Sequence, residues 1–209
     1  AQLSSFQYSK LDQTLGEFEG GAADADEMWE RIDYFLSRVV PVAESNKVQI
    51  ACHPQDPGIA DNLYRGVARV MGTVEGLKKF ISMHESPYHG LNFCQGTVSE
   101  MLESPGEEIF DVIRYFGERN KIFNVHFRNI KGGLLDFVEV FPDEGDINML
   151  DAIKVYRDVG YKYMLMPDHV PGLSLKSDDE NAHWGSSARR VGFAYCYGYI
   201  NAALQTIAE

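Results

Sequence analysis

Four side chains that commonly bind metal ions each follow a short apolar segment of the sequence. They are His53, Cys94, His126 and Asp168. Successive members are 41, 32 and 42 residues apart (53 to 94, 94 to 126 and 126 to 168). One strand–helix–strand unit takes roughly 30 or more residues. Because the carboxyl ends of parallel strands meet at one edge of a sheet, where α/β folds bind their ligands, this spacing predicts a shared site.

The types of these four residues also constrain the chemistry. Two imidazoles, a thiolate and a carboxylate favour Mn²⁺, Fe²⁺ or Zn²⁺ over Ca²⁺ and Mg²⁺, which prefer oxygen ligands. Each residue alone has a structural explanation, since a histidine can be a hydrogen-bonded core residue, a cysteine a small buried hydrophobe and an aspartate a helix cap. The conjunction of all four at one strand edge is what predicts a metal site.

Three polar residues close to these positions are further candidates. His169 directly follows Asp168 and is a natural acid–base group because its pKa lies near working pH; the alternatives are a fifth ligand or a residue that orients the ligands. Arg128 could bind a substrate carboxylate through two hydrogen bonds, with a surface ion pair as the alternative. Asp56, in the rigid segment HPQDPG, is a candidate for supporting the metal ligands or contacting substrate, with a helix cap as the alternative.

Two polar segments are expected to be loops. The acidic segment DFVEVFPDEGD is predicted to be a solvated loop, with the alternative that one of its carboxylates contacts substrate hydroxyls. Residues 170–186 are long and polar, and we expect them to form an active-site loop in which Trp184 folds over the pocket.

The elements that position these residues alternate between strand and helix patterns. The segments KVQIAC, GLNFC, KIFNVHF and YKYMLM read as strands, and each is followed by a helical pattern. A further helix is predicted over about 26–45, where Pro41 should kink or re-cap it. Residues 1–26 are expected to be an irregular lead-in. This alternation is typical of a parallel α/β architecture.

The number of strands suggests a specific fold. A closed (β/α)₈ TIM barrel typically takes about 250 residues and eight strands. We therefore expect residues 1–209 to form a single domain that carries roughly the second half of such a barrel, as four βα units. An open four-stranded sheet is the alternative.

Composition excludes several classes of function. A net charge of −12 argues against nucleic-acid binding, which requires a basic surface. No apolar run approaches the ~20 residues of a membrane helix, and the first residues lack the layout of a signal peptide. Three cysteines are too few and too odd a set for a disulfide framework, so a cytoplasmic location is expected.

The motifs HPQDP, NFCQG, NVHFRN, GDINM and MPDH, in that order, resemble the mannonate dehydratase family. The resemblance runs from about Trp29 to near Gln205. It implies a xylose-isomerase-like TIM barrel that uses Mn²⁺ or Fe²⁺ and dehydrates D-mannonate to 2-keto-3-deoxy-D-gluconate in hexuronate catabolism. It also implies that the four residues named first are the metal ligands, that His169 is the acid–base residue and that Arg128 contacts substrate. Trp184 stands where well-known members carry a tyrosine.

Two other functions stay open. One is a metal-dependent sugar isomerase or epimerase on the same barrel. The other is a non-catalytic protein with a structural zinc site, which would be tetrahedral and closed, whereas catalysis needs an open position on the metal. Barrel enzymes of this type are often homo-oligomers, although nothing in the sequence locates an interface.

Overall fold

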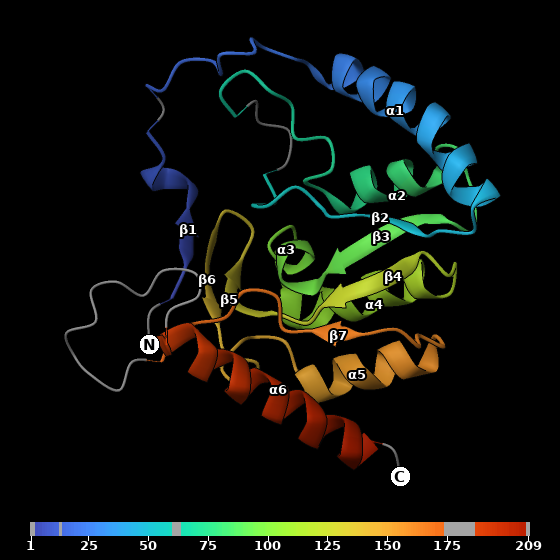
Figure 1. Ribbon diagram of the computed structural model, residues 1–209. Helices are drawn as coiled ribbons and strands as arrows, with labels where there is room; N and C mark the ends of the chain where they lie inside the picture. The colour runs from blue at the N-terminus through green and yellow to red at the C-terminus, as the bar shows by residue number, and fades with distance from the viewer. Residues whose placement is uncertain (1–2, 13, 60–63, 174–186, 208–209) are drawn as a thin grey trace.

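A computed structural model describes residues 3–12, 14–59, 64–173 and 187–207 of the chain (Figure 1). Its centre is a four-stranded sheet of order β2-β3-β4-β7 in which every pairing is parallel. The strands are Ile50–Cys52, His89–Cys94, Ile122–His126 and Leu165–Met166. The predicted parallel α/β class is therefore confirmed. These four described strands form an open sheet, so closure into a barrel stays a prediction.

Helices follow each strand where the sequence pattern places them. In Figure 1, α1 and α2 lie beside β2 and β3 at the top, and α5 and α6 lie below β7. None of the helices in the described ranges is long and apolar enough to cross a membrane. The main helices are α1 (Ala25–Ser45), α2 (Val74–Ser82), α4 (Pro105–Gly117), α5 (Met149–Asp158) and α6 (Ser187–Ile207).

Local chemistry explains where these helices begin. The Thr73 hydroxyl accepts a hydrogen bond from Gly76 N and caps α2, and the Asn148 side chain caps α5 in the same way. Glu107 and Glu108 lie in the first turn of α4, where they complement the helix dipole. Helix α1 continues past Pro41 to its end at Ser45, so the expectation that the proline re-caps the helix is wrong.

A second, antiparallel sheet was not expected. It has the order β1-β6-β5 and is built from Ser5–Gln7, Asp136–Val140 and Asn129–Gly133. Two expectations are therefore wrong. The lead-in contains a strand and a short 3₁₀ helix, Tyr8–Lys10, and the acidic segment begins with a strand rather than a loop.

A short helix directly follows Cys94. Helix α3 (Gln95–Ser99) is wholly buried, and the Cys94 sulfur caps it by accepting from Thr97 N. This cap fixes the thiol at the end of β3.

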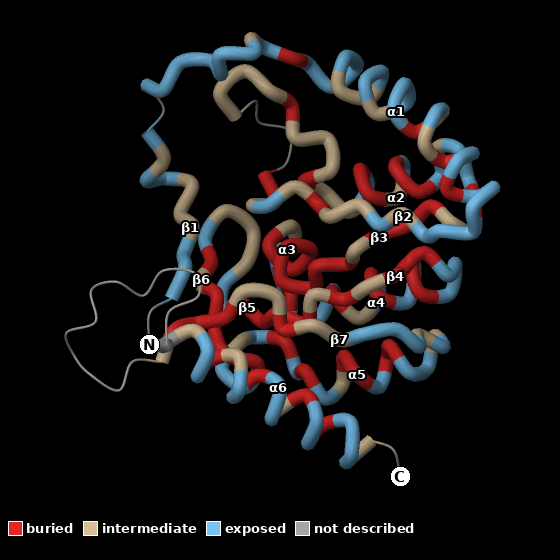
Figure 2. The backbone as a smooth tube through the Cα atoms, viewed as in Figure 1, coloured by how far each residue is buried: buried red, intermediate tan, exposed pale blue. Residues whose placement is uncertain are grey.

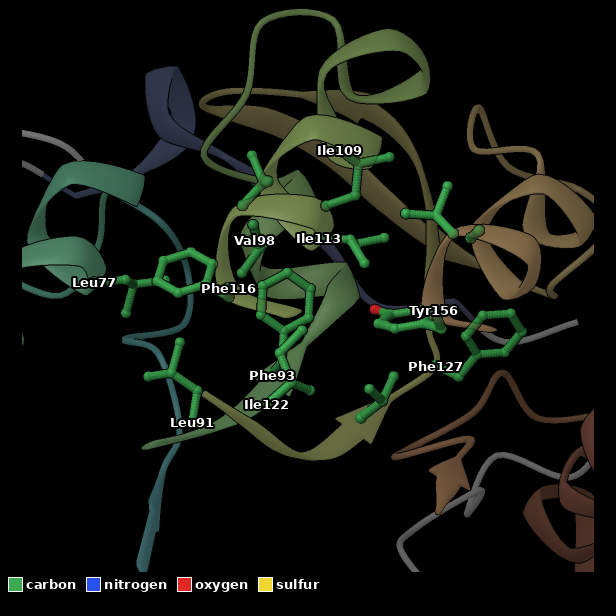
Figure 3. Close-up of a cluster of buried hydrophobic side chains, with 14 of the residues drawn as sticks. Leu77, Leu91, Phe93, Val98, Ile109, Ile113, Phe116, Ile122, Phe127 and Tyr156 are labelled. Carbon is green, nitrogen blue, oxygen red and sulfur yellow. The ribbon is translucent and has the colours of Figure 1, made fainter. Parts of the chain in front are cut away.

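The hydrophobic core lies between the parallel sheet and the helices that pack on it, with buried residues from α1 to α6 (Figures 2 and 3). Phe93 on β3 has its ring centroid 5.9 Å from that of Phe116 and 6.5 Å from that of Tyr156, and all three side chains are buried. Burial of each such side chain stabilises the fold by about 1.5–3 kcal/mol. This packing holds the strands rigidly, and their carboxyl ends then fix the polar side chains that follow them.

Candidate metal centre

The four candidate ligands meet at the carboxyl edge of the parallel sheet. His53 directly follows β2, Cys94 ends β3, His126 ends β4, and Asp168 lies two residues beyond β7. One ligand atom from each residue lies within 4.8 Å of the others. Cys94 and His126 are paired in the strand register, which brings these two side chains together directly.

Hydrogen bonds orient the two imidazoles. Nδ1 of His53 lies 2.6 Å from the Pro54 carbonyl oxygen, to which it donates, so Nε2 keeps the lone pair. Nε2 of His126 lies 3.1 Å from the side-chain amide of Asn92, which in turn contacts Asn124. Nδ1 of His126 is buried, lies 3.4 Å from Oδ1 of Asp168 and makes no hydrogen bond of good geometry among the described residues. That unsatisfied nitrogen faces the cluster, as a metal ligand would.

The Cys94 sulfur is held as a thiolate. Burial alone would raise its pKa, but the guanidinium of Arg128 and the imidazoles of His126 and His53 lower the pKa of the thiol to about 5. The Thr97 hydroxyl donates to the sulfur over 3.1 Å. At neutral pH the thiolate form, which binds metals, therefore predominates.

The Asp168 carboxylate places a second anion beside the sulfur. Although burial opposes it, contacts with His126, His169 and Arg128 lower the pKa of Asp168 to about 2. Its Oδ2 lies 3.8 Å from the Cys94 sulfur, and its φ of 65° lies in the left-handed region that aspartate tolerates better than most residues. Two anions this close need a cation between or beside them.

His126 carries part of that positive charge in the structure. Its pKa is raised to about 9 because Asp168 and Cys94 outweigh the effect of burial. A divalent ion bound to Nδ1 would take the place of this proton. The donor set, the unsatisfied nitrogen and the paired anions all fit Mn²⁺, Fe²⁺ or Zn²⁺.

Arg128 lies beneath the cluster as a buried ion-pair centre. Its side chain is 2% exposed, and Nη2 lies 2.8 Å from Glu100 Oε1 and 3.0 Å from Asp56 Oδ2. Nη1 pairs with Glu139. The surface ion pair considered as an alternative is therefore wrong, since these ion pairs are in the interior. Gly96 of α3 is necessary for this arrangement, because a Cβ there would overlap Nε of Arg128.

His169 lies between Glu139 and the ligand cluster. Its Nδ1 is 2.9 Å from Glu139 Oε2, and its Nε2 is 3.2 Å from Nη1 of Arg128 and 3.5 Å from Asp168 Oδ2. Burial and the charge of Arg128 lower the pKa of His169, but the hydrogen bond to Glu139 and the charges of Glu139 and Asp168 together outweigh them, so the net shift is upward. The side chain is thus placed to exchange a proton beside the cluster.

Two other sequence candidates have different outcomes. Asp56 has a 34% exposed side chain, accepts a hydrogen bond from Arg128 and lies 2.9 Å from Thr97 Oγ1, so it reaches both the cluster and solvent. Trp184 lies outside the described residues.

The sequence interpretation did not single out several polar residues that support the site, although Glu139 was among the carboxylates considered for substrate contact. In β6 the alternation Phe137-Val138-Glu139 places Glu139 on the buried face with Phe137, and this period of two was a usable signal. Glu100 and Asn92 had no comparable signal, since Asn92 is a single polar residue in an apolar run and Glu100 follows the mixed segment QGTVS.

The fold and the cluster define an α/β protein with a candidate metal centre at the carboxyl edge of a parallel sheet. A xylose isomerase domain protein from Planctomyces limnophilus shares this fold, with a TM-score of 0.50 and 16% identity over 65% of this chain and 45% of that one. The chain belongs to the mannonate dehydratase family, because the family model "D-mannonate dehydratase (UxuA)" matches residues 2–209.

Individual relatives agree with this membership. The mannonate dehydratase of Endomicrobium trichonymphae is 31% identical over 182 residues, which cover 85% of this chain and 47% of the relative. That of Thermotoga maritima is 30% identical over 200 residues, which cover 94% of this chain and 53% of the relative. The crystal structure of mannonate dehydratase from Streptococcus suis serotype 2 superimposes with a TM-score of 0.70 at 26% identity. The match covers 88% of this chain and 51% of that one. The chain thus spans about half the length of the relatives it matches.

Proposed function

We propose that this protein is a metal-dependent hydro-lyase that removes water from a sugar acid, converting D-mannonate to 2-keto-3-deoxy-D-gluconate in hexuronate catabolism. The observation that carries the proposal is the convergence of four ligand atoms within 4.8 Å in a chain of the mannonate dehydratase family. The relatives named as mannonate dehydratases support the choice of substrate.

The residues that would hold the metal are His53 through Nε2, Cys94 through its sulfur, His126 through Nδ1 and Asp168 through its carboxylate. We propose Mn²⁺ or Fe²⁺. When bound, such an ion supplies Lewis-acid polarisation of a substrate carboxylate and an adjacent hydroxyl, which acidifies the proton on C2.

The chain's own residues would then move the proton and hold the substrate. Nε2 of His169 lies on the side of the cluster, where it can take the C2 proton or protonate the departing C3 hydroxyl, which leaves as water. The resulting enol tautomerises to the 2-keto acid, so all atoms are accounted for by the loss of one water. Asp56 is placed to accept from a substrate hydroxyl, and its ion pair with Arg128 holds the carboxylate in position. The contact of Arg128 with substrate and the closing role of Trp184 are part of the proposal.

The wider architecture is also proposed. The likeness to the Streptococcus suis structure supports a single domain in which the four parallel strands form part of a xylose-isomerase-like (β/α)₈ barrel. The free thiols of Cys52, Cys94 and Cys196 support a reducing, cytoplasmic location. We expect a small sugar acid as the ligand, no nucleic-acid or membrane partner, and assembly into a homo-oligomer.

A direct assay tests the proposed activity. The complete protein loaded with Mn²⁺ is incubated with D-mannonate, and mass spectrometry is expected to show a 2-keto acid lighter by one water. An isomer of unchanged mass would favour the isomerase or epimerase instead, and absence of any product would exclude both. Asp168→Asn should abolish turnover, whereas the exposed Glu144→Gln should not.

A further inference from the structure

We propose that Glu139 is a positioning residue that fixes the tautomer of His169, an inference that rests on the proposed dehydratase activity. Glu139 belongs to β6, outside the parallel sheet that carries the candidate ligands. Its side chain is 9% exposed, and each of its two oxygens has its own partner.

The two partners of Glu139 are both donors. Oε1 accepts from Nη1 of Arg128, which has only N–H groups to offer. Oε2 lies 2.9 Å from Nδ1 of His169, so a carboxylate there requires a proton on Nδ1. The buried carboxylate is therefore satisfied only with one histidine tautomer.

The opposite side of the imidazole gives the same assignment independently. Nη1 of Arg128 also lies 3.2 Å from Nε2 of His169, and because an arginine nitrogen can only donate, this contact is a hydrogen bond only when Nε2 holds a lone pair. That lone pair lies on the side of Asp168, whose Oδ2 is 3.5 Å away. The arrangement thus places the basic nitrogen of His169 next to the candidate metal centre.

The backbone around Glu139 makes the arrangement rigid. Strands β5 and β6 form a hairpin in which Ile130 pairs with Glu139, and Arg128 precedes β5 by one residue. The amide of Glu139 also donates to Ser4 O over 2.9 Å, beside β1 on the other side. The antiparallel sheet therefore serves to hold Arg128 and Glu139 together below the imidazole.

Replacing Glu139 with glutamine isolates this role. Both contact points require an acceptor, but an amide offers one oxygen and one NH₂ group. If the oxygen stays on Arg128, the NH₂ group faces Nδ1 of His169 and drives its proton to Nε2. The reverse orientation sets the NH₂ group against the guanidinium, which leaves buried donors opposed. Glu139→Asp keeps both carboxylate oxygens as acceptors, on a side chain that is shorter by one methylene group.

The experiment compares Glu139→Gln, Glu139→Asp and, as a matched control, Asp136→Asn, an exposed carboxylate at the start of the same strand. Two-bond ¹H–¹⁵N spectra of the complete, Zn²⁺-loaded protein at alkaline pH, assigned with a His169→Gln variant, report the tautomer. We expect wild type, Glu139→Asp and Asp136→Asn to carry the proton on Nδ1, and Glu139→Gln to carry it on Nε2. With Mn²⁺ and D-mannonate, Glu139→Gln should lower kcat by about 10²–10⁴-fold with KM and Mn²⁺ affinity unchanged. Glu139→Asp should recover part of the loss.

Several outcomes would overturn the inference. A wild-type spectrum with the proton on Nε2 does so without any variant, which matters if Glu139→Gln fails to fold. Equal loss of stability and Mn²⁺ affinity in Glu139→Gln and Glu139→Asp, with His169 keeping its tautomer in both, would show a merely structural role. A further outcome is that wild type gives no product while His169 carries its proton on Nδ1 in wild type and on Nε2 in Glu139→Gln. In that case the proposed function fails and the positioning role of Glu139 stands.

Discussion

Nη2 of Arg128 lies 2.8 Å from Oε1 of Glu100, and both side chains are buried in the same pocket beneath the candidate metal centre. Burial raises the pKa of Glu100 to about 9, with repulsion from Asp56 and Cys94 adding to it, although Arg128 opposes the shift. Oε2 of Glu100 has no hydrogen-bond partner among the described residues. This raised pKa favours the neutral form of Glu100 at pH 7, in which Oε1 still accepts from Nη2 of Arg128.

This relationship predicts that the two partners differ strongly in their effect on stability. Glu100→Gln keeps a neutral acceptor for Arg128 and should change the free energy of unfolding by less than about 1 kcal/mol at pH 7. Arg128→Met removes the cation shared by several buried anions and should cost about 3–5 kcal/mol. Urea denaturation of both variants measures this. The control is Arg114→Met, whose exposed ion pair with Asp111 contributes at most about 1 kcal/mol. Equal losses in Glu100→Gln and Arg128→Met would mean that Glu100 is ionised.

A second prediction concerns the close approach of α3 to Arg128. Alanine at position 96 would place a Cβ against the Arg128 side chain, which is itself held by its ion pairs. Overpacking of this kind costs about 1–3 kcal/mol, more than the ~1 kcal/mol that alanine gains over glycine in a helix. Gly96→Ala should therefore lower the urea midpoint.

Gly198 in α6 provides the matched control, because nothing lies within 4 Å of a Cβ built there. Gly198→Ala should gain about 0.5–1 kcal/mol from helix propensity alone. If both glycine variants shifted stability in the same direction, overlap with Arg128 would not be the reason for glycine at position 96.

The metal site leads to a third prediction, which compares two buried cysteines. Cys94→Ser replaces a thiolate by a neutral hydroxyl and should lower the affinity for Mn²⁺ by about tenfold or more. Cys196 is also buried but packs with Phe141 and Val170 in a separate small cluster. Cys196→Ala should leave the affinity unchanged. Isothermal titration calorimetry with Mn²⁺ distinguishes the two, and equal affinities for wild type and Cys94→Ser would remove the sulfur from the ligand set.

The parallel half of the fold was predictable because its signals are local and repeated. Short apolar runs alternate with helical periodicity, and caps such as Thr73 and Asn148 mark the helix starts. Once the strands are parallel, geometry alone brings His53, Cys94 and their partners to one edge. The placement of those candidates therefore needed no knowledge of side-chain packing.

The antiparallel sheet was not predictable by the same reasoning. Its hairpin turns at Leu134 and Leu135, and Leu135 adopts a φ of 67° that a sequence pattern reserves for glycine or asparagine. The charged residues of β6 also made the segment look like a polar loop, although its buried and exposed residues alternate as in a strand. Without that strand, the buried position of Glu139 could not be predicted. The burial of Arg128 depends on tertiary contacts that no local pattern encodes.

A last prediction concerns acid stability and a histidine at the opposite edge of the sheet. His89 begins β3 and is 1% exposed, with Nε2 3.0 Å from the Phe80 carbonyl oxygen. Burial lowers its pKa below the ordinary value of 6.5, and the charges of Lys121 and His84 add to the effect.

The sign of the pH dependence follows from this lowered pKa. Well above pH 6.5 the imidazole of His89 is neutral in both folded and unfolded chains, so its contribution is fully present. As the pH falls below 6.5, the unfolded chain binds a proton that the folded chain does not, and stability decreases at up to about 1.4 kcal/mol per pH unit. His89→Gln keeps a donor for the Phe80 carbonyl but cannot titrate, so it should lack this loss. Urea unfolding between pH 7.5 and 5 measures the free energy of unfolding of wild type and of His89→Gln at each pH. In the difference between the two, the contributions of the other histidines cancel. A difference that does not change with pH would show that His89 titrates alike in the folded and unfolded chains.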